Sequence, residues 1–364
     1  MFKVKNIKGR RRIGKLKTMH GVINTPFFMP DATRGFTRSL SKNDLEKIGV
    51  GPMVVNAYHL YLQPEMKLIK KSGGINKFMN WPYPLLSDSG GYQVFSLIHK
   101  NPRMGKITDN EVIFKSPSDG KKHILTPEKA IQIQFDLGVD IMVCLDDPPP
   151  NNYPKDKIAK AVERTIAWAA RCKTEYEKQI KSRKISEDRK PLIFGVIQGG
   201  KYLDLRKHCA DELVKIDFNG YGFGARHLDM DGNFMEQVVR ETANFIPENS
   251  LRFALGIGTP EDIVRSAHLG WDMFDCVIPT REGRHGRLFI KKDGLYKYKT
   301  ININNEKYKT DFSPVDKNCD CELCQNYSRA YLRHIFAMKD PLAMRLASIH
   351  NLKFYMDLMK ELRS

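Results

Sequence analysis

Short apolar runs alternate with longer amphipathic segments along most of this chain, and this alternation constrains the fold more than any other feature. Seven runs have the length and composition of buried strands: 53–58, 84–88, 141–146, 192–198, 221–224, 253–258 and 273–278. The clearest helical segments lie between them, at 127–138, 157–180 and 260–270. Strands that alternate with helices in this way form a parallel sheet.

The number of strands predicts a (β/α)8 barrel, with one strand missed or lying near the N-terminus. A doubly wound open sheet is the alternative, although no Gly-x-Gly-x-x-Gly opens a helix after the first strand. The length of 364 residues suits one large domain with a small satellite. We place the catalytic barrel at 1–300 and a subdomain at 301–364, where a polar stretch, a cysteine cluster and further helical patterns follow one another.

The composition excludes several classes of protein. Apolar residues make up 41% of the chain and charged residues 28%, which argues against a disordered chain. No apolar run is long enough to cross a bilayer, and the basic N-terminus lacks the apolar core of a signal peptide. The seven cysteines do not form a disulfide pattern, which is typical of a reducing compartment. We therefore expect a cytoplasmic protein without a membrane partner.

The charge favours a polyanionic partner. Sixty Lys and Arg stand against 42 Asp and Glu, which gives a formal net charge of +18. Such an excess most often indicates a nucleic acid, although a Lys-rich solubilising surface is the alternative. The segment 279–287, PTREGRHGR, carries Arg281, Arg284 and Arg287. We interpret it as a loop that contacts phosphates and bases, in preference to a solvated charged loop.

Polar residues recur at the carboxyl ends of the predicted strands. They are Asn56, Asp88, Asp146, Gln198, Gly224 and, within the last strand, Asp275. In a parallel barrel these ends lie on one face, where active sites form. Several aspartates on one face are hard to explain as helix caps alone, so we predict a shared site. Carboxylates in one pocket can serve as nucleophile, proton carrier and hydrogen-bond acceptor in glycosidic chemistry.

The stretch Ser87-Asp88-Ser89-Gly90-Gly91 allows two interpretations. A plain turn uses Asp and Gly for their backbone conformations alone. A catalytic aspartate would use the glycines so that a ligand can approach the backbone, with N–H groups left free. Beside the other strand ends, we favour the second interpretation.

The cluster Cys319-x-Cys321-x-x-Cys324 has the spacing of a metal site, and zinc is its usual occupant. A fourth ligand is needed. His334 and His350 both lie in helical patterns nearby, and the spacing does not choose between them.

Together these motifs resemble the tRNA-guanine transglycosylase family. The stretches that carry the resemblance are SDSGGYQVFS, Asp146-Asp147-Pro148, FGVIQGG, GIGTPEDIV, DMFDCVIPTREGRHGR, and CDCELC with His350-Asn351. They occur in the family order over nearly the whole chain. The resemblance implies a barrel with a zinc-binding subdomain and, as partners, a tRNA anticodon stem-loop and a 7-deazaguanine base. It implies exchange of the wobble guanine in the queuosine pathway, and a homodimer.

The resemblance also implies roles for individual residues. Asp275 matches the nucleophile that attacks C1′ of the ribose, and Asp88 matches the general acid/base. The other matches are Asp146, Gln198 and the backbone of Gly224 as base readers, Tyr92 and Leu255 on the two faces of the base, Asn56 as a polar neighbour, and Cys319, Cys321, Cys324 and His350 as zinc ligands. His350 is thereby preferred over His334.

The chain departs from the family pattern at a few positions. Pro148 stands where bacterial members usually have cysteine, and Arg226-His227 follows Gly224-Ala225 in place of small or apolar residues. A cationic pair there predicts that the preferred base is not the simple aminomethyl deazaguanine. Two alternatives remain: a relative that acts on DNA or on another tRNA position, and a non-catalytic RNA-binding subunit. Intact Asp88 and Asp275 disfavour the second.

Overall fold

A computed structural model gives the structure of residues 2–117 and 120–364. Eight parallel strands form one sheet in the order β4-β14-β13-β12-β11-β10-β6-β5. A parallel bridge between Asp31 and Val54 joins the two ends of this sheet, and the Ala32 N–H donates to the Val54 carbonyl over 2.8 Å. The predicted barrel is therefore confirmed, and β4, near the N-terminus, is the eighth strand, which sequence analysis did not locate. The strands are β4 Phe27–Pro30, β5 Met53–Asn56, β6 Leu85–Asp88, β10 Ile141–Val143, β11 Leu192–Ile197, β12 Gly220–Phe223, β13 Leu251–Ala254 and β14 Met273–Cys276.

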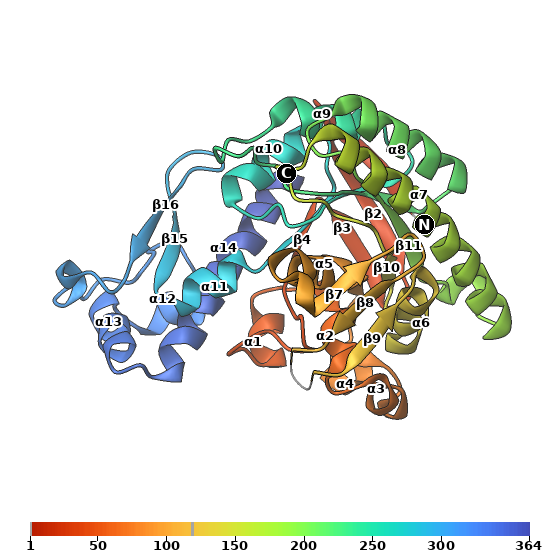
Figure 1. Ribbon diagram of the computed structural model, residues 1–364. Coiled ribbons are helices and arrows are strands. Elements are labelled where there is room, and N and C mark those ends of the chain that lie inside the picture. The colour runs from red at the N-terminus through yellow and green to blue at the C-terminus, as the bar shows by residue number, and fades with distance from the viewer. Residues whose placement is uncertain (1, 118–119) are drawn as a thin grey trace.

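Helices surround the sheet on its outer side (Figure 1). They are α1 Lys42–Lys47, α2 Ala57–Leu62, α3 Met66–Ser72, α4 Ile75–Met79, α5 Gly91–Lys100, α6 Pro127–Leu137, α7 Lys155–Ser182, α8 Leu203–Ile216, α9 Glu236–Asn244 and α10 Pro260–His268. Short 3-10 turns lie at Pro102–Met104 and Glu187–Arg189, and another at Glu306–Tyr308 among the C-terminal elements. The three predicted helices correspond to α6, α7 and α10. Over the described part of the chain, no helix combines the length and apolar composition needed to cross a bilayer.

Two strands, β5 and β14, end earlier than predicted because the chain turns directly into a helix. The side chain of Asn56 caps α2 by accepting a hydrogen bond from the His59 N–H at 3.0 Å. The last strand ends at Cys276, and helix α11 (Ile278–Arg284) follows with Pro279 in its first turn. The arginine segment is therefore mostly helix, and the prediction of a loop there was wrong.

The barrel interior is a packed apolar core. Seven of the eight strands contribute side chains to it: Phe27, Met29, Val54, Leu86, Ile141, Val143, Phe194, Val196, Leu251, Phe253 and Met273. A separate antiparallel sheet, β1 (Phe2–Lys8), β2 (Arg11–Thr18) and β3 (Gly21–Thr25), adds Leu16 and Ile23 to the same cluster. A filled interior leaves the carboxyl ends of the strands as the place for a site.

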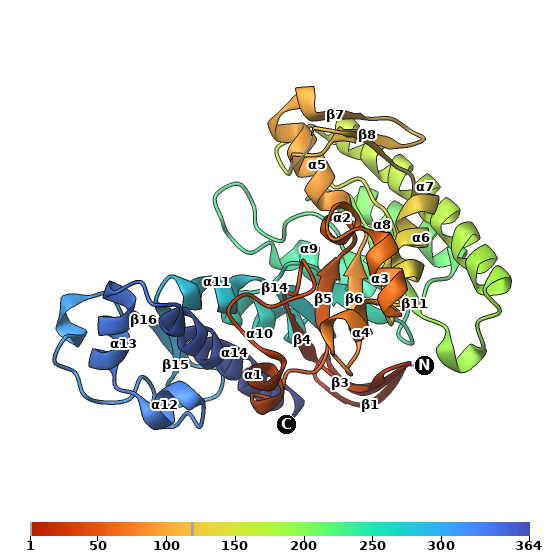
Figure 2. The same ribbon diagram turned by 90° about the horizontal axis from the view of Figure 1, so that it is seen from below.

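Two further segments extend the barrel. An antiparallel sheet, β7 (Gly105–Ile107), β8 (Val112–Lys115) and β9 (Lys122–Leu125), lies between α5 and α6 in the chain. After α11 come the hairpin β15 (Arg287–Lys291) and β16 (Tyr298–Asn302) and the helices α12 (Glu322–Asn326) and α13 (Arg329–Ala337). These C-terminal elements lie to one side of the barrel (Figure 2).

Helix α14 (Pro341–Arg363) returns from the C-terminal elements and packs against α10, α11 and β4. The ring of Tyr355 lies 4.8 Å from that of Phe28 in β4, and its hydroxyl donates to the Gly258 carbonyl at 2.7 Å. A division of the chain at residue 300 falls inside β16 and stays a prediction.

Candidate functional site

A layer of side chains lies just above the apolar interior, at the carboxyl end of the barrel. Side chains alternate along a strand, so the residue two positions beyond an interior residue faces the same side. After seven of the strands, β4, β5, β6, β11, β12, β13 and β14, this position holds in turn Asp31, Asn56, Asp88, Gln198, Gly224, Leu255 and Asp275. Strand β10 ends at Val143, and Asp146 follows three residues later. The layer therefore brings together the predicted strand-end residues and adds Asp31, which sequence analysis missed.

Asp88 is held by three hydrogen-bond donors. Its carboxylate accepts from Nδ2 of Asn56 at 2.6 Å, from the Gly90 N–H at 3.1 Å and from Nε2 of Gln93 at 3.4 Å. The pKa of Asp88 is raised to about 7, mainly by burial. The hydrogen bond from the Gly90 N–H lowers this pKa, and the charge of Asp275 raises it. A carboxyl group with this pKa can both take and give a proton near neutral pH.

Asp275 has a simpler environment. Its Oδ1 accepts a hydrogen bond from the Gly256 N–H at 2.8 Å. Burial raises the pKa of Asp275 to about 6, the Gly256 N–H lowers it, and the charge of Asp31 raises it. Asp275 therefore ionises at lower pH than Asp88, which suits a nucleophile beside a proton carrier.

Asp146 and Gln198 form a buried pair. Nε2 of Gln198 donates to Oδ2 of Asp146 at 2.7 Å, and burial raises the pKa of Asp146 to about 7. Oε1 of Gln198 is buried and has no hydrogen-bond partner in residues 2–117 and 120–364. A buried acceptor without a partner is costly unless a ligand supplies the donor. The pair can therefore receive N–H groups of a bound base.

Gly224 makes room for this pair. A Cβ atom at Gly224 would clash with the side-chain amide of Gln198. The Gly224 N–H donates to the Ile197 carbonyl at 2.9 Å, and its carbonyl accepts from Nη2 of Arg206 at 2.9 Å. Both backbone groups thus have partners inside the protein.

The two glycines after Asp88 make room for neighbouring protein atoms. The prediction that their N–H groups are free was wrong, and the approach of a ligand to this turn stays a prediction. Gly90 has a φ of +77°, and a Cβ there would lie 2.6 Å from Cβ of Tyr58. A Cβ at Gly91 would lie 2.9 Å from Cδ1 of Leu145. Their N–H groups are also used, by Asp88 and by Oγ of Ser89.

Two apolar side chains are the candidates for covering the faces of a bound base. Tyr92, in the first turn of α5, is 63% exposed and offers a ring face. Leu255 is partly buried and lies over Gly222, where a Cβ would meet its Cδ1. Asp147 has a different role, since it pairs with Arg164, which also contacts Asp109 at 2.8 Å in the turn between β7 and β8. Asp147 therefore ties the inserted sheet to the barrel.

The three arginines differ in their pairing. Arg281 and Arg287 both approach Glu282, at 3.4 and 3.7 Å. Arg284 has no ion-pair partner in the part of the chain that the structure describes, and the same holds for exposed Arg38. Burial lowers the pKa of Arg284, and the charge of Arg38 lowers it further. Arg38 and Arg284 are thus neighbouring cations without an ion-pair partner among the described residues. Sequence analysis missed Arg38, because it lies in the loop after β4.

The two basic residues after Gly224 differ in their surroundings. Arg226 is exposed, whereas Nε2 of His227 lies 3.2 Å from Oδ2 of Asp262 at the start of α10. Nδ2 of Asn151 donates to the Leu228 carbonyl at 3.1 Å and links this segment to the chain after β10. Arg226 thus has no carboxylate beside it among the described residues, whereas His227 has one.

A second cluster lies in the C-terminal elements. The ligand atoms of Cys319, Cys321, Cys324 and His350 all lie within 4.8 Å of one another. Nε2 of His350 contacts the Phe289 carbonyl at 2.7 Å, so Nδ1 faces the thiols, at 3.6 Å from Cys321 and 3.3 Å from Cys324. Tetrahedral zinc, with Zn–S of about 2.3 Å and Zn–N of about 2.0 Å, places S and N about 3.5 Å apart. The four residues therefore fit a metal ion, whereas His334 is exposed on α13 outside the cluster.

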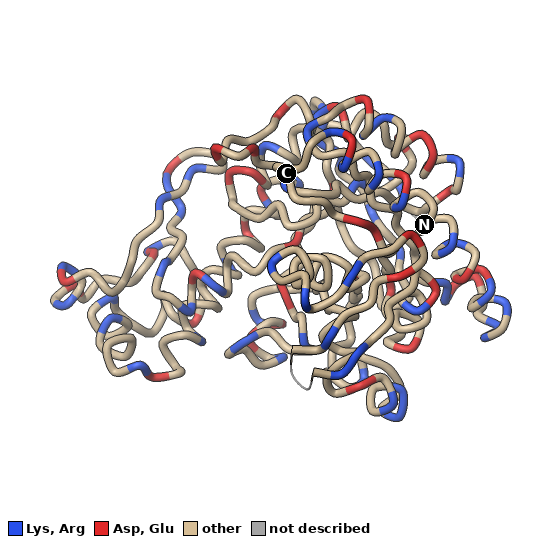
Figure 3. Tube along the Cα trace, viewed as in Figure 1, with Lys and Arg blue, Asp and Glu red and all other residues tan. Residues whose placement is uncertain are grey.

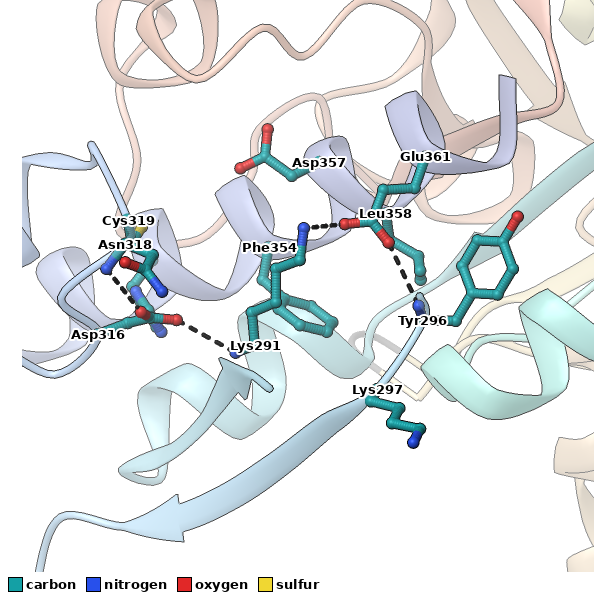
Figure 4. Close-up of a pocket in the computed structure, with 11 residues that line it drawn as sticks. Lys291, Tyr296, Lys297, Asp316, Asn318, Cys319, Phe354, Asp357, Leu358 and Glu361 are labelled. Carbon is teal, nitrogen blue, oxygen red and sulfur yellow. Dashed lines mark hydrogen bonds and ion pairs between the residues drawn. The ribbon is translucent and has the colours of Figure 1, made fainter. Parts of the chain in front are cut away.

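The cluster is anchored beside a small cavity between the hairpin and α14 (Figure 4). Asp316 accepts from the backbone N–H groups of Lys291 at 3.1 Å and Asn318 at 2.9 Å. The Lys291 side chain pairs with Glu361 of α14. These contacts fix the cysteine segment relative to β15 and α14, independently of the metal ligands.

Comparison with known proteins agrees with this arrangement. A family model described as "Queuine tRNA-ribosyltransferase" matches residues 8–364. Relatives with the same name include one from Halothermothrix orenii, 43% identical over 359 residues, and one from Thermoanaerobacter pseudethanolicus, 44% identical over 359 residues; each alignment covers 99% of this chain and 91% of the relative. A relative from Staphylococcus aureus is 41% identical over 352 residues, covering 97% of this chain and 88% of its own. With the strand-end layer and the cysteine–histidine cluster in place, this chain belongs to the queuine tRNA-ribosyltransferase family.

Proposed function

We propose that this protein is a tRNA-guanine transglycosylase that exchanges the wobble guanine of tRNA anticodons for a 7-deazaguanine. The observation that carries the proposal is the pair Asp88 and Asp275, which share one layer in a chain that belongs to this family. Burial raises their pKa values to about 7 and about 6, so near neutral pH one carboxyl is mostly ionised while the other still holds a proton in part.

The reaction proceeds through two displacements at C1′. The ionised Asp275 attacks C1′, a C1′–O bond forms, the bond from C1′ to N9 of guanine breaks, and Asp88 gives its proton to the leaving base. The incoming base then gives a proton to Asp88, its nitrogen attacks C1′, and the ester to Asp275 breaks. Two inversions retain the configuration at C1′, as in retaining glycosidases. Bonds and charges balance without a redox or nucleotide cofactor.

The base is held by the neighbours of this pair. Asp146 accepts an N–H of the base and Gln198 offers its free Oε1, while Gly224 keeps the space that Gln198 occupies. Tyr92 and Leu255 cover the two faces of the ring, and Asn56 positions Asp88. Flipping the nucleotide costs a few kcal/mol, least in a loop, and these contacts offset that cost.

The surroundings supply RNA contacts and structural support. Arg281, Arg284 and Arg287 contact the anticodon stem-loop, with Arg284 as the cation that has no internal ion pair in the described chain. Zinc is the metal that fits the cysteine–histidine cluster best, where it would stabilise the C-terminal elements. A homodimer and a cytoplasmic location complete the proposal, the latter because none of the seven cysteines is in a disulfide.

Incorporation of labelled guanine tests this function. The protein should incorporate labelled guanine into an anticodon stem-loop with guanosine at the wobble position. Unlabelled 7-deazaguanine should then replace the labelled guanine irreversibly. Exchange only in a stem-loop with guanosine elsewhere, or in the DNA analogue alone, would support a relative with another target. Binding of the stem-loop without any exchange would support a non-catalytic subunit.

A further inference from the structure

Asp31 occupies the place in the strand-end layer directly beside the nucleophile. Strand β4 neighbours β14 with Asp275 opposite Met29 and Cys276 opposite Pro30. Met29 belongs to the barrel interior, and Asp31 follows two positions later on the same face. On its other side Asp31 bridges to Val54, the interior residue below Asn56. Its carboxylate therefore lies on the site rim between β14 and β5.

The backbone around Asp31 is fixed by hydrogen bonds. The Thr33 N–H donates to Oδ1 of Asp31 at 3.0 Å, and the Thr33 hydroxyl donates to the same oxygen. Oγ1 of the buried Thr37 donates to the Asp31 carbonyl at 3.2 Å. The Thr33 carbonyl accepts from the Asn56 N–H at 3.2 Å, which links this turn to the group that holds Asp88. Asp31 is thus held in place before substrate binds.

One oxygen of this carboxylate is available to a ligand. Both hydrogen bonds from Thr33 use Oδ1, and Oδ2 has no partner in the described chain. Asp31 is partly exposed at the carboxyl end of β4. The negative charge reaches Asp275 and Arg284, since it raises the pKa of each.

We infer that Oδ2 of Asp31 accepts a hydrogen bond from the 2′-hydroxyl of the nucleotide whose base is exchanged. This inference rests on the proposed function. The base readers Asp146, Gln198 and Gly224 follow β10, β11 and β12, on the side of Asp275 that leads through β13, whereas Asp31 follows β4, the neighbour of β14 on the other side. The side of Asp275 that faces β4 is therefore the side available to the ribose.

The chemistry of an internal nucleotide selects this hydroxyl. Its 5′ and 3′ oxygens are esterified to phosphate, so the 2′-hydroxyl is the only free donor on the ribose. It is attached to the carbon next to C1′, the atom that Asp275 attacks. A carboxylate accepts a hydrogen bond from a hydroxyl but repels phosphate. Asp31 would therefore contact the ribose, while Arg284 contacts the phosphate backbone.

This contact would distinguish RNA from DNA at the exchanged nucleotide, because the 2′-hydroxyl is the group that differs between them. In glycosidic chemistry such a hydrogen bond also strengthens in the transition state. Asp31 is accordingly a substrate-binding residue whose loss lowers kcat/KM on RNA more than on a 2′-deoxy substrate.

A cycle of two enzymes and two substrates tests the inference. The substrates are the same anticodon stem-loop with either guanosine or 2′-deoxyguanosine at the wobble position, and the readout is kcat/KM for incorporation of labelled guanine. The parent protein should prefer the ribose substrate by about 10- to 100-fold, the usual effect of a hydrogen bond to a charged group. Asp31→Ala should reduce this preference to near unity, with little change on the deoxy substrate.

Two further variants serve as controls. Asp31→Asn keeps an acceptor oxygen and should keep most of the preference. Thr33→Val removes one hydrogen bond to Oδ1 but leaves the carboxylate, so its preference should equal that of the parent.

Three results are informative in different ways. If Asp31→Ala lowers activity on both substrates by the same factor, Asp31 acts on the fold or on Arg284, and the inference is wrong. The inference is equally wrong if the parent protein exchanges guanine but shows no ribose preference. If the parent exchanges no guanine in the all-ribose stem-loop, the proposed function itself has failed.

Discussion

At the scale of single residues, the division of labour between Asp88 and Asp275 follows from their surroundings. Three donors hold Asp88, with Asn56 the closest, whereas Asp275 has the Gly256 N–H. Their charges interact, so the pair titrates with macroscopic pKa values that belong to both groups. Release of guanine needs Asp275 ionised and Asp88 protonated, and these two requirements set opposite limits on pH.

We predict a bell-shaped pH dependence for the first displacement, with limbs near pH 6 and near pH 7. The rate rises with pH as Asp275 ionises and falls at higher pH as Asp88 loses its proton. Single-turnover release of guanine would measure it. Asp88→Asn should be about 10²- to 10⁴-fold slower and should lack the upper limb. A parent rate that only rises across this range would show that Asp88 is not the proton donor.

Gly224 offers a second prediction at this scale. Gly224→Ala should displace Gln198 and break its contact with Asp146, since the added Cβ takes the place of the amide. Steady-state kinetics should show kcat/KM for the free base lowered by about 10- to 100-fold. Gly51→Ala is the matched control, because a Cβ there meets no atom within 4 Å. Equal activity of the two variants would remove Gln198 from base recognition.

At the scale of elements, helix α14 carries the histidine of the cysteine–histidine cluster into contact with β15. His350→Ala should lose the metal, and His334→Ala on α13 should keep it. Metal analysis of the purified proteins should find about one zinc per chain in the parent, in a site that contributes on the order of 10 kcal/mol to local folding. Metal retained by His350→Ala and lost by His334→Ala would reverse the assignment.

The elements also show which parts of the structure can be predicted from sequence. Asp88 and Asp275 were predicted because each follows or interrupts a short apolar run. Asp31 was missed, although Phe27–Pro30 is such a run, because its final proline disguised the strand. The helix over the arginine segment was missed because Gly283 and Gly286 suggested a loop. Spacing alone left His334 and His350 open as the fourth ligand; the family resemblance selected His350, and the path of α14 brings it to the cysteines.

At the scale of the whole molecule, the excess of positive charge is spread along the chain. Figure 3 shows Lys and Arg distributed over the trace among acidic residues, without a single basic block. A net charge of +18 therefore attracts RNA in general, while individual unpaired cations set the contacts. Arg284 is the best placed of these, beside Arg38.

Binding of the stem-loop should weaken as salt rises, and Arg284→Ala should lower both the affinity and the salt dependence. The slope of log K against log salt should fall by about 0.7 for one lost phosphate contact in single-stranded RNA. Arg240→Ala on α9 is the matched control, since Arg240 pairs with Glu236 on the same helix. A slope that Arg284→Ala leaves unchanged would show that Arg284 does not touch the RNA backbone.

The covalent intermediate tests the central claim, that Asp275 attacks the ribose of tRNA. The parent protein, incubated with a wobble-guanosine stem-loop without added base, should give an adduct of protein and RNA that survives denaturing electrophoresis. Asp275→Asn should bind the same stem-loop with unchanged affinity and give no adduct. A denaturant-stable adduct formed by Asp275→Asn would contradict the account and make Asp88 the first alternative nucleophile.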